Sequence, residues 1–249
     1  MRLLVSVRSA GEVAAAVSGG ADIIDAKEPD RGSLGAVSAE TLCDIAEQVP
    51  GERSLSAALG DFTDPAKVDA AISGFPHLDR RGPWYLKLGF AGVSDARRVR
   101  ELLETAARAA RHRRPPTPLI IGVAYGDWEL AGTARPELVC HAAAGAGAAG
   151  LLLDTQVKLG THLLDWIGSE RLAALVAVAR SAGLLTAVAG GLGAKQLQVV
   201  GHCEPDIVGF RGAVCSGGRT GRVSQTRVAA IRRAMVGTFS LSSGGSIDH

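Results

Sequence analysis

Short apolar runs alternate with longer amphipathic segments along almost the whole chain. The runs span residues 3–7, 23–26, 55–58, 85–88, 119–124, 151–154, 185–189 and 207–210. Each run is short and apolar without strict alternation, which is typical of a strand that is buried on both faces.

The segments between the runs carry apolar residues at helical spacing. They include residues 10–18, 39–48, 95–111, 136–144, 169–182, 195–202 and 225–235. Parallel strands need crossover connections, which are usually helices, and the distance between successive runs leaves room for one each time. Glycines typical of helix ends, such as Gly19-Gly20 and Gly183, come shortly before the next run.

Eight strand–helix units in a chain of 249 residues predict an α/β protein with a single (β/α)8 (TIM) barrel, for which ~250 residues is typical. We assign residues 1–235 to the barrel and expect residues 236–249, which are rich in Ser and Gly, to form a flexible C-terminal tail. The structural alternative is a doubly wound open sheet. No GxGxxG motif follows the first run, where Ser6-Val7-Arg8-Ser9 stands, so a dinucleotide site is disfavoured.

Composition and charge narrow the class of protein. Hydrophobic residues make up 47% of the chain and charged residues 21%, which fits a packed core. The net charge of +2 is too mild to indicate nucleic-acid binding. We find no signal peptide and no apolar stretch of the ~18 residues that a membrane helix needs, so we expect a cytoplasmic protein without membrane association. The 4 cysteines form no CxxC pair, and we predict free thiols and no metal site.

Three lysines stand at or just after the ends of predicted strands: Lys27, Lys87 and Lys158. In a (β/α)8 barrel the active site lies at the C-terminal ends of the strands, so these lysines should share one cavity. Burying an ammonium group is costly unless it is paired or neutralised, so three such placements suggest a site that needs an amine. An ordinary rim lysine or an Asp25–Lys27 ion pair is the simpler interpretation of any one of them.

Two carboxylates are expected in the same cavity. Asp25 and Lys27 are two residues apart on an extended strand, so their side chains point the same way, and Asp154 comes from the opposite side of the ring. Neighbouring ammonium groups and desolvation lower the pKa of a lysine and make its amine available as a nucleophile for a carbonyl substrate. A second lysine can then act as a general acid or base.

The ends of the last two strands are rich in glycine. The loops after strands 7 and 8 of such barrels commonly hold a phosphate group through backbone N–H groups. We therefore predict a phosphate site at Gly190, Gly191, Arg211 and Gly212, with Arg211 as a bidentate clamp. On the glycines alone, tight turns without a ligand explain the pattern equally well.

Several of these segments resemble one known family. The sequence GGADIIDAKEP at residues 19–29, followed by GSLGA at residues 32–36, closely resembles (5-formylfuran-3-yl)methyl phosphate synthase, also called 4-(hydroxymethyl)-2-furancarboxaldehyde-phosphate synthase. The similarity recurs in SAALGD at residues 56–61, in KLG at 87–89, in LDT at 153–155 with Lys158, and in DIVGFRGAVC at 206–215. It extends to about residue 235. The chain departs from the family pattern in an Arg- and Pro-rich insertion at residues 111–118 and in its polar tail, and neither bears a predicted catalytic residue.

The resemblance implies a (β/α)8 barrel that joins two molecules of glyceraldehyde 3-phosphate into a phosphorylated furan aldehyde, with loss of phosphate and water. It implies that Lys27 carries a Schiff base, that Lys87 accepts a proton, and that Asp25, Asp154 and Lys158 also line the site. The product leads to the furan of methanofuran or of methylofuran, and the composition of the chain favours methylofuran. No cofactor is required, and we expect a triose phosphate as the small-molecule substrate. We also expect a homo-oligomer, whose subunit number is left open.

Two rival functions are left open at this level. One is another Schiff-base barrel aldolase that acts on a phosphorylated sugar, and the other is a barrel that binds a phosphorylated ligand without catalysis. The role of Lys158 is also open, because it either protonates a leaving hydroxyl group or only lowers the pKa of Lys27. The triose phosphate that forms the Schiff base, as aldehyde or as ketone, is not fixed either.

Overall fold

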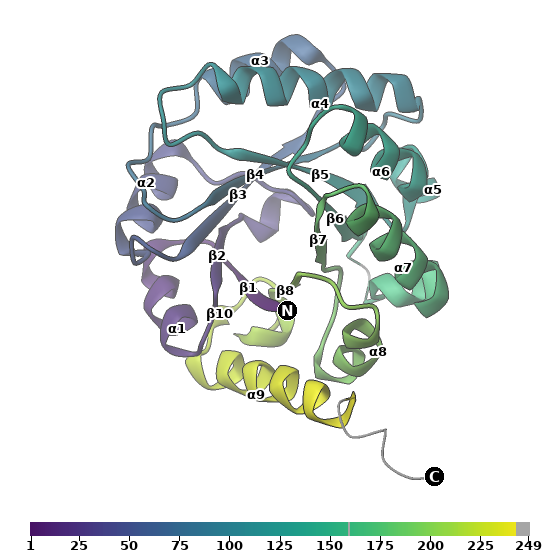
Figure 1. Cartoon of the computed structure of the whole chain (residues 1–249). Coiled ribbons are helices and arrows are strands. Elements are labelled where there is room, and N and C mark those ends of the chain that lie inside the picture. Colours follow the sequence, from purple (N-terminus) through teal and green to yellow (C-terminus); the bar gives the residue numbers. More distant parts are fainter. Residues whose placement is uncertain (159, 243–249) are drawn as a thin grey trace.

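The computed structural model describes residues 1–158 and 160–242, which form a closed barrel of eight parallel strands (Figure 1). The strands follow one another around the ring in chain order, and β8 closes the ring by pairing with β1. They are β1 (Arg2–Val7), β2 (Ile23–Ala26), β3 (Ser54–Asp61), β4 (Trp84–Gly89), β5 (Leu119–Tyr125), β6 (Gly150–Asp154), β7 (Leu185–Val188) and β8 (Ile207–Phe210). The predicted (β/α)8 barrel is confirmed, and the open-sheet alternative is wrong.

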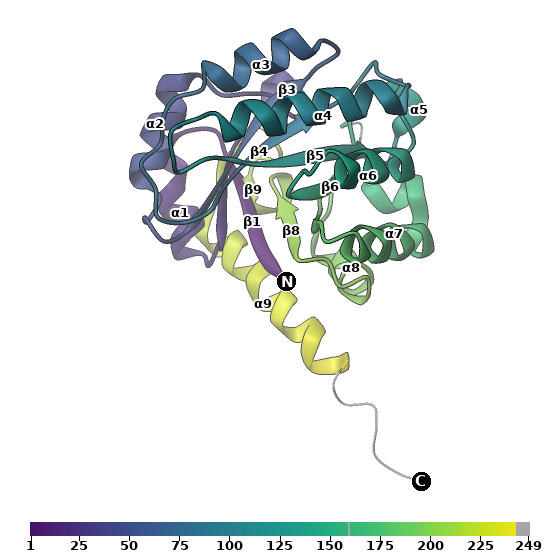
Figure 2. The ribbon, with the colours of Figure 1, turned by 45° about the horizontal axis from the view of Figure 1, so that its top comes forward.

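Helices surround the strands (Figures 1 and 2). They are α1 (Val13–Ser18), α2 (Ala39–Gln48), α3 (Pro65–Ser73), α4 (Ala96–Arg111), α5 (Trp128–Ala131), α6 (Pro136–Gly145), α7 (Leu163–Ser181), α8 (Leu197–His202) and α9 (Gln225–Ser242). Single 3-10 turns occur at η1 (Ala10–Glu12), η2 (Pro29–Arg31), η3 (Ala194–Gln196) and η4 (Gly212–Val214). A short antiparallel hairpin of β9 (Cys215–Ser216) and β10 (Arg222–Val223) lies between β8 and α9.

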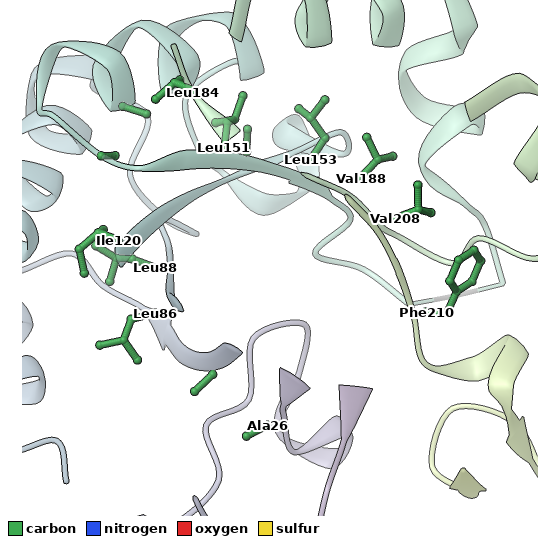
Figure 3. Close-up of a cluster of buried hydrophobic side chains, with 14 of the residues drawn as sticks. Ala26, Leu86, Leu88, Ile120, Leu151, Leu153, Leu184, Val188, Val208 and Phe210 are labelled. Atoms are coloured by element: carbon green, nitrogen blue, oxygen red, sulfur yellow. The ribbon is translucent and has the colours of Figure 1, made fainter. Parts of the chain in front are cut away.

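Each strand is buried on both faces, which explains the continuous apolar runs in the sequence. One set of side chains points outward and packs against the helices. Figure 3 shows this outer layer, which includes Leu86, Leu88, Ile120, Leu151, Leu153, Val188, Val208 and Phe210. The alternate residues point into the barrel and form a second cluster, which includes Ile23, Tyr85, Ile121, Leu152 and Ile207. The barrel interior therefore has an apolar lower part beneath the polar strand ends.

Two helices differ from the sequence prediction. The sequence predicts a helix that begins at residue 169, whereas α7 begins at Leu163 and is interrupted at Gly168, whose φ of 67° is left-handed. The sequence also predicts the end of the last helix at Met235, whereas α9 continues to Ser242 and projects beyond the barrel in Figure 2. The remaining residues of the predicted tail, 243–249, lie outside the described residues. Within the described part, no helix is long and apolar enough to cross a membrane.

Candidate active site

A cavity of about 420 Å³ opens at the C-terminal ends of the strands and reaches into the barrel. All eight strands contribute to its walls, and so do the loops that follow β2, β6, β7 and β8. The predicted site residues that line it are Asp25, Lys27, Lys87, Asp154, Lys158, Gly190, Gly191, Arg211 and Gly212. The structure thus brings together the whole predicted set, although the roles of its members differ.

Asp25 on β2 and Lys87 on β4 form a buried ion pair. The Nζ atom of Lys87 lies 2.7 Å from a carboxylate oxygen of Asp25, and their side chains are 5% and 0% exposed. The hydroxyl group of Ser6, which lies beside Asp25 in the strand register, donates a second hydrogen bond of 2.7 Å to this carboxylate. Burial alone would raise the pKa of Asp25, but the ammonium groups of Lys87 and Lys27 outweigh it and lower the pKa below its usual value. The Asp25 carboxylate is therefore held as an anion, and it pairs with Lys87 rather than with Lys27.

Asp154 and Lys158 form a second pair at the end of β6. The Nζ atom of Lys158 donates to Asp154 over 2.8 Å and to the hydroxyl group of Thr155 over 2.9 Å. The backbone N–H of Thr155 donates to the same carboxylate over 2.7 Å. Burial would raise the pKa of Asp154, but Lys158 and Lys27 lower it further than burial raises it. Each carboxylate is thus held as an anion beside its own lysine.

The side chain of Lys27 makes no hydrogen bond or ion pair with any of the described residues, in contrast to the other two lysines of the site. It follows β2 directly and is 8% exposed. Burial lowers the pKa of Lys27 to about 8, and the ammonium group of Lys87 lowers it as well, while Asp154 and Asp25 act in the opposite direction. An amine that is unpaired and easily deprotonated is what nucleophilic attack on a carbonyl group requires.

Gly190 and Gly191 form a tight turn that no other residue type fits. Their φ angles are 96° and 66°, a left-handed backbone that side chains rarely adopt. A Cβ atom on Gly190 would lie 3.0 Å from the backbone nitrogen of Thr155, and one on Gly191 would lie 2.5 Å from the carbonyl oxygen of Thr161. Within the described part of the chain, the N–H groups of Gly190, Gly191 and Gly212 have no protein acceptor. These three groups are therefore available to an anion in the cavity.

The guanidinium group of Arg211, the predicted anion clamp, is bonded to protein acceptors. Its guanidinium group donates to both carboxylate oxygens of Glu12, and to the backbone oxygens of Ser6, Arg219 and Gly221. These contacts use all five N–H donors of the side chain. Arg211 and Glu12 are 4% and 2% exposed, and the pair ties the loops after β1 and β8 together. In this structure the carboxylate of Glu12, distant in the sequence, occupies the two terminal nitrogens of the guanidinium group that a bidentate phosphate clamp would use.

Arg219 lines the cavity although the sequence did not mark it as a site residue. It lies on the loop between β9 and β10, and its guanidinium group donates to the backbone oxygens of Pro29 and Gly32 in the loop after β2. Burial lowers the pKa of Arg219, and Asp154 partly offsets this effect. The hairpin of β9 and β10 brings Arg219 to the cavity. The sequence contains no signal for this hairpin, because strands of two residues are too short to show a periodic pattern.

The fold and the cavity define a (β/α)8-barrel protein with an unpaired lysine between two carboxylate–lysine pairs at the C-terminal ends of its strands. Residues 3–232 match the family model described as 4-HFC-P synthase, and the chain belongs to this family. The family is one of synthases, so the barrel is that of an enzyme.

Named relatives agree with the family match. The chain is 36% identical over 235 residues to "(5-formylfuran-3-yl)methyl phosphate synthase" of Methanobrevibacter smithii, covering 93% of this chain and 98% of the relative. It is 33% identical over 238 residues to the protein of the same name from Methanothermobacter thermautotrophicus, covering 94% and 99%. Among solved structures, a phosphoribosylanthranilate isomerase from Thermotoga maritima superposes with a TM-score of 0.60 at 15% identity, covering 95% and 99% of the two chains. That similarity concerns the barrel fold alone.

Proposed function

We propose that this enzyme joins two molecules of glyceraldehyde 3-phosphate into 4-(hydroxymethyl)-2-furancarboxaldehyde phosphate through a Schiff base on Lys27. The names of the relatives support the product. The observation that carries the mechanism is the state of Lys27, which is buried and unpaired within the described residues and has a pKa of about 8. The atoms balance when two triose phosphates give one furan phosphate, one inorganic phosphate and two molecules of water.

The proposed reaction starts with attack of the neutral Lys27 amine on a substrate carbonyl. Loss of water gives an iminium ion, which withdraws electrons and acidifies the neighbouring carbon. Removal of a proton there gives an enamine, which expels the phosphate group from the carbon next to its double bond as inorganic phosphate. The carbon freed of phosphate then forms the new bond with the carbonyl carbon of the second triose phosphate. The amine is released again when the iminium ion is hydrolysed or displaced by ring closure.

Proton transfer falls to the Asp25–Lys87 pair in this proposal. Lys87 lies on β4 and lines the same cavity as Lys27, and Asp25 holds its Nζ atom in place at 2.7 Å. Lys87 donates a proton as the ammonium form and accepts one as the amine, so it can serve both the deprotonation of carbon and the departure of a hydroxyl group. Lys158, fixed by Asp154 at 2.8 Å, supplies a second acid for the loss of water.

The glycine turns are the proposed phosphate site. The free N–H groups of Gly190, Gly191 and Gly212 offer hydrogen bonds to phosphate oxygens without a side-chain clamp. Binding by backbone N–H groups explains why Arg211 can be committed to Glu12 without loss of the anion site. The furan product would then supply the furan of methanofuran or methylofuran.

The experiment follows ultraviolet absorbance of the furan after glyceraldehyde 3-phosphate is added. Lys27→Met should abolish furan formation, whereas the control Lys195→Met, at an exposed lysine outside the cavity, should react like the unmodified protein. Substrate consumption without furan absorbance would indicate an ordinary aldolase. Furan formation at an unchanged rate in Lys27→Met would refute the Schiff-base assignment.

A further inference from the structure

The cavity continues below the lysines into an apolar chamber. Its walls there are formed by Leu4, Ile23, Ile121, Leu152 and Ile207, which come from five different strands. Burying a phosphate dianion among such side chains is strongly unfavourable, so the phosphate of a ligand stays near the glycine turns. The chamber is therefore suited to a part of the ligand that carries no charge.

Two hydroxyl groups interrupt the apolar lining. Ser56 on β3 and Tyr85 on β4 are register partners, and both line the cavity. They are 1% and 6% exposed, and neither hydroxyl makes a hydrogen bond with any of the described residues. Tyr125, the other buried tyrosine, contrasts with them because its hydroxyl donates to Asp61 over 2.8 Å. Buried polar groups in native proteins normally have a partner, so these two hydroxyls are available to a ligand.

Ser56 and Tyr85 lie close to the reacting groups in the strand register of the barrel. Tyr85 precedes Lys87 by two residues on the same strand, which puts it one inward-facing position deeper, about 6–7 Å further down. Ser56 is also the register partner of Asp25. A triose phosphate is about as long as this separation between the lysine level and the hydroxyl level, so one ligand can reach both.

We propose that Ser56 and Tyr85 bind the oxygen atom at the phosphate-free end of the substrate. In this orientation the phosphate lies at the glycine turns, and the carbonyl carbon of the ketone isomer of the triose phosphate, in the middle of the molecule, lies beside Lys27. The terminal hydroxyl group of this isomer enters the chamber. The proposal rests on the function proposed above and adds two positioning residues to it. The chamber also accommodates the uncharged formyl group of the product, whose oxygen accepts the same hydrogen bonds.

The test compares two probes that differ in one oxygen atom. Glycerol 3-phosphate carries the terminal hydroxyl group, and 2-hydroxypropyl phosphate lacks it. Isothermal titration calorimetry should show about tenfold tighter binding of glycerol 3-phosphate to the unmodified protein. Tyr85→Phe should reduce this ratio, and the double variant Ser56→Ala/Tyr85→Phe should bring it to about one, with affinity for 2-hydroxypropyl phosphate unchanged.

Tyr125→Phe is the matched control. It removes a tyrosine hydroxyl that is bound to Asp61 and does not line the cavity, so it should keep the probe ratio and lower the melting temperature. Tyr85→Phe should leave the melting temperature unchanged, because its hydroxyl loses no partner among the described residues. Equal affinity of the unmodified protein for both probes, or an unchanged ratio in the double variant, would overturn the proposal. The binding ratio needs no turnover, so a failure of furan formation would refute the proposed function separately.

Discussion

At neutral pH, Lys27 should exist as a free amine to an extent that an ordinary lysine does not reach. With a pKa of about 8 in place of the usual 10.5, about 9% of this side chain is deprotonated at pH 7, against about 0.03% for an unshifted lysine. The difference is about 300-fold in the reactive form. Burial is the main cause, because the low-dielectric surroundings disfavour the ammonium form.

Competitive labelling with a trace of acetic anhydride measures this property directly. Peptide mass spectrometry gives the acetylation rate of each lysine between pH 6 and 11, and the midpoint of the curve is independent of how slowly the reagent enters the cavity. The exposed residues Lys67 and Lys195 provide reference rates in the same sample. The labelling of Lys27 should have its midpoint near pH 8.

Two substitutions should move this midpoint in opposite directions. Lys87→Met removes a neighbouring positive charge that lowers the pKa of Lys27, so the midpoint should rise. Asp154→Asn removes the carboxylate that raises the pKa of Lys27 most, so the midpoint should fall. A midpoint near 10.5 in the unmodified protein, or shifts of the same sign in both variants, would refute the electrostatic reasoning.

Three further predictions concern stability and anion binding. Arg211→Met should lower the free energy of unfolding by about 3–5 kcal/mol, because it leaves the Glu12 carboxylate buried and unpaired, and adding Glu12→Gln should restore part of the loss; urea denaturation of both variants checks this. Gly190→Ala should weaken binding of inorganic phosphate at least tenfold in calorimetric titrations, whereas the control Gly183→Ala, with a φ of 76° and no atom within 4 Å of the added Cβ, should lose stability but keep phosphate affinity. The pKa of Lys27 is lower in the folded protein than in the unfolded chain, so the buried ammonium group destabilises the folded state at neutral pH. As the pH rises from about 8 to 10.5, the unfolded chain gradually loses the advantage of binding this proton, and the folded state gains stability. Relative to Lys27→Met, the unmodified protein should therefore gain about 3 kcal/mol of stability across this range in denaturation curves, and a constant difference would contradict the shift.

Hydrophobic patterning predicted the barrel well because each strand is buried on both faces. The predicted bounds of β2 and β8 coincide with the observed ones, and the other strands differ by a few residues. The helix α3 was harder to recognise, since its apolar face is narrow, with Val68 and Ile72 as its buried residues. The hairpin of β9 and β10 leaves no periodic signal, because four strand residues are too few to show one.

The membership of the site was easier to predict than the pairing within it. Strand-end positions brought Asp25, Lys27 and Lys87 into one cavity, as expected. Which lysine pairs with which carboxylate depends on side-chain directions across the barrel, and these are not written in the spacing of residues along the chain. Arg211 is the sharpest example, because its partner Glu12 lies at the other end of the sequence and becomes its neighbour only when β8 pairs with β1.

Reductive trapping tests the central claim most directly. The protein is incubated with glyceraldehyde 3-phosphate and sodium borohydride, and the adduct is located by peptide mass spectrometry. We predict one covalent adduct on Lys27 that disappears in Lys27→Met and persists in Lys195→Met. An adduct that forms undiminished in Lys27→Met, or that maps to Lys87 or Lys158 in the unmodified protein, would contradict the assignment of Lys27 as the Schiff-base residue.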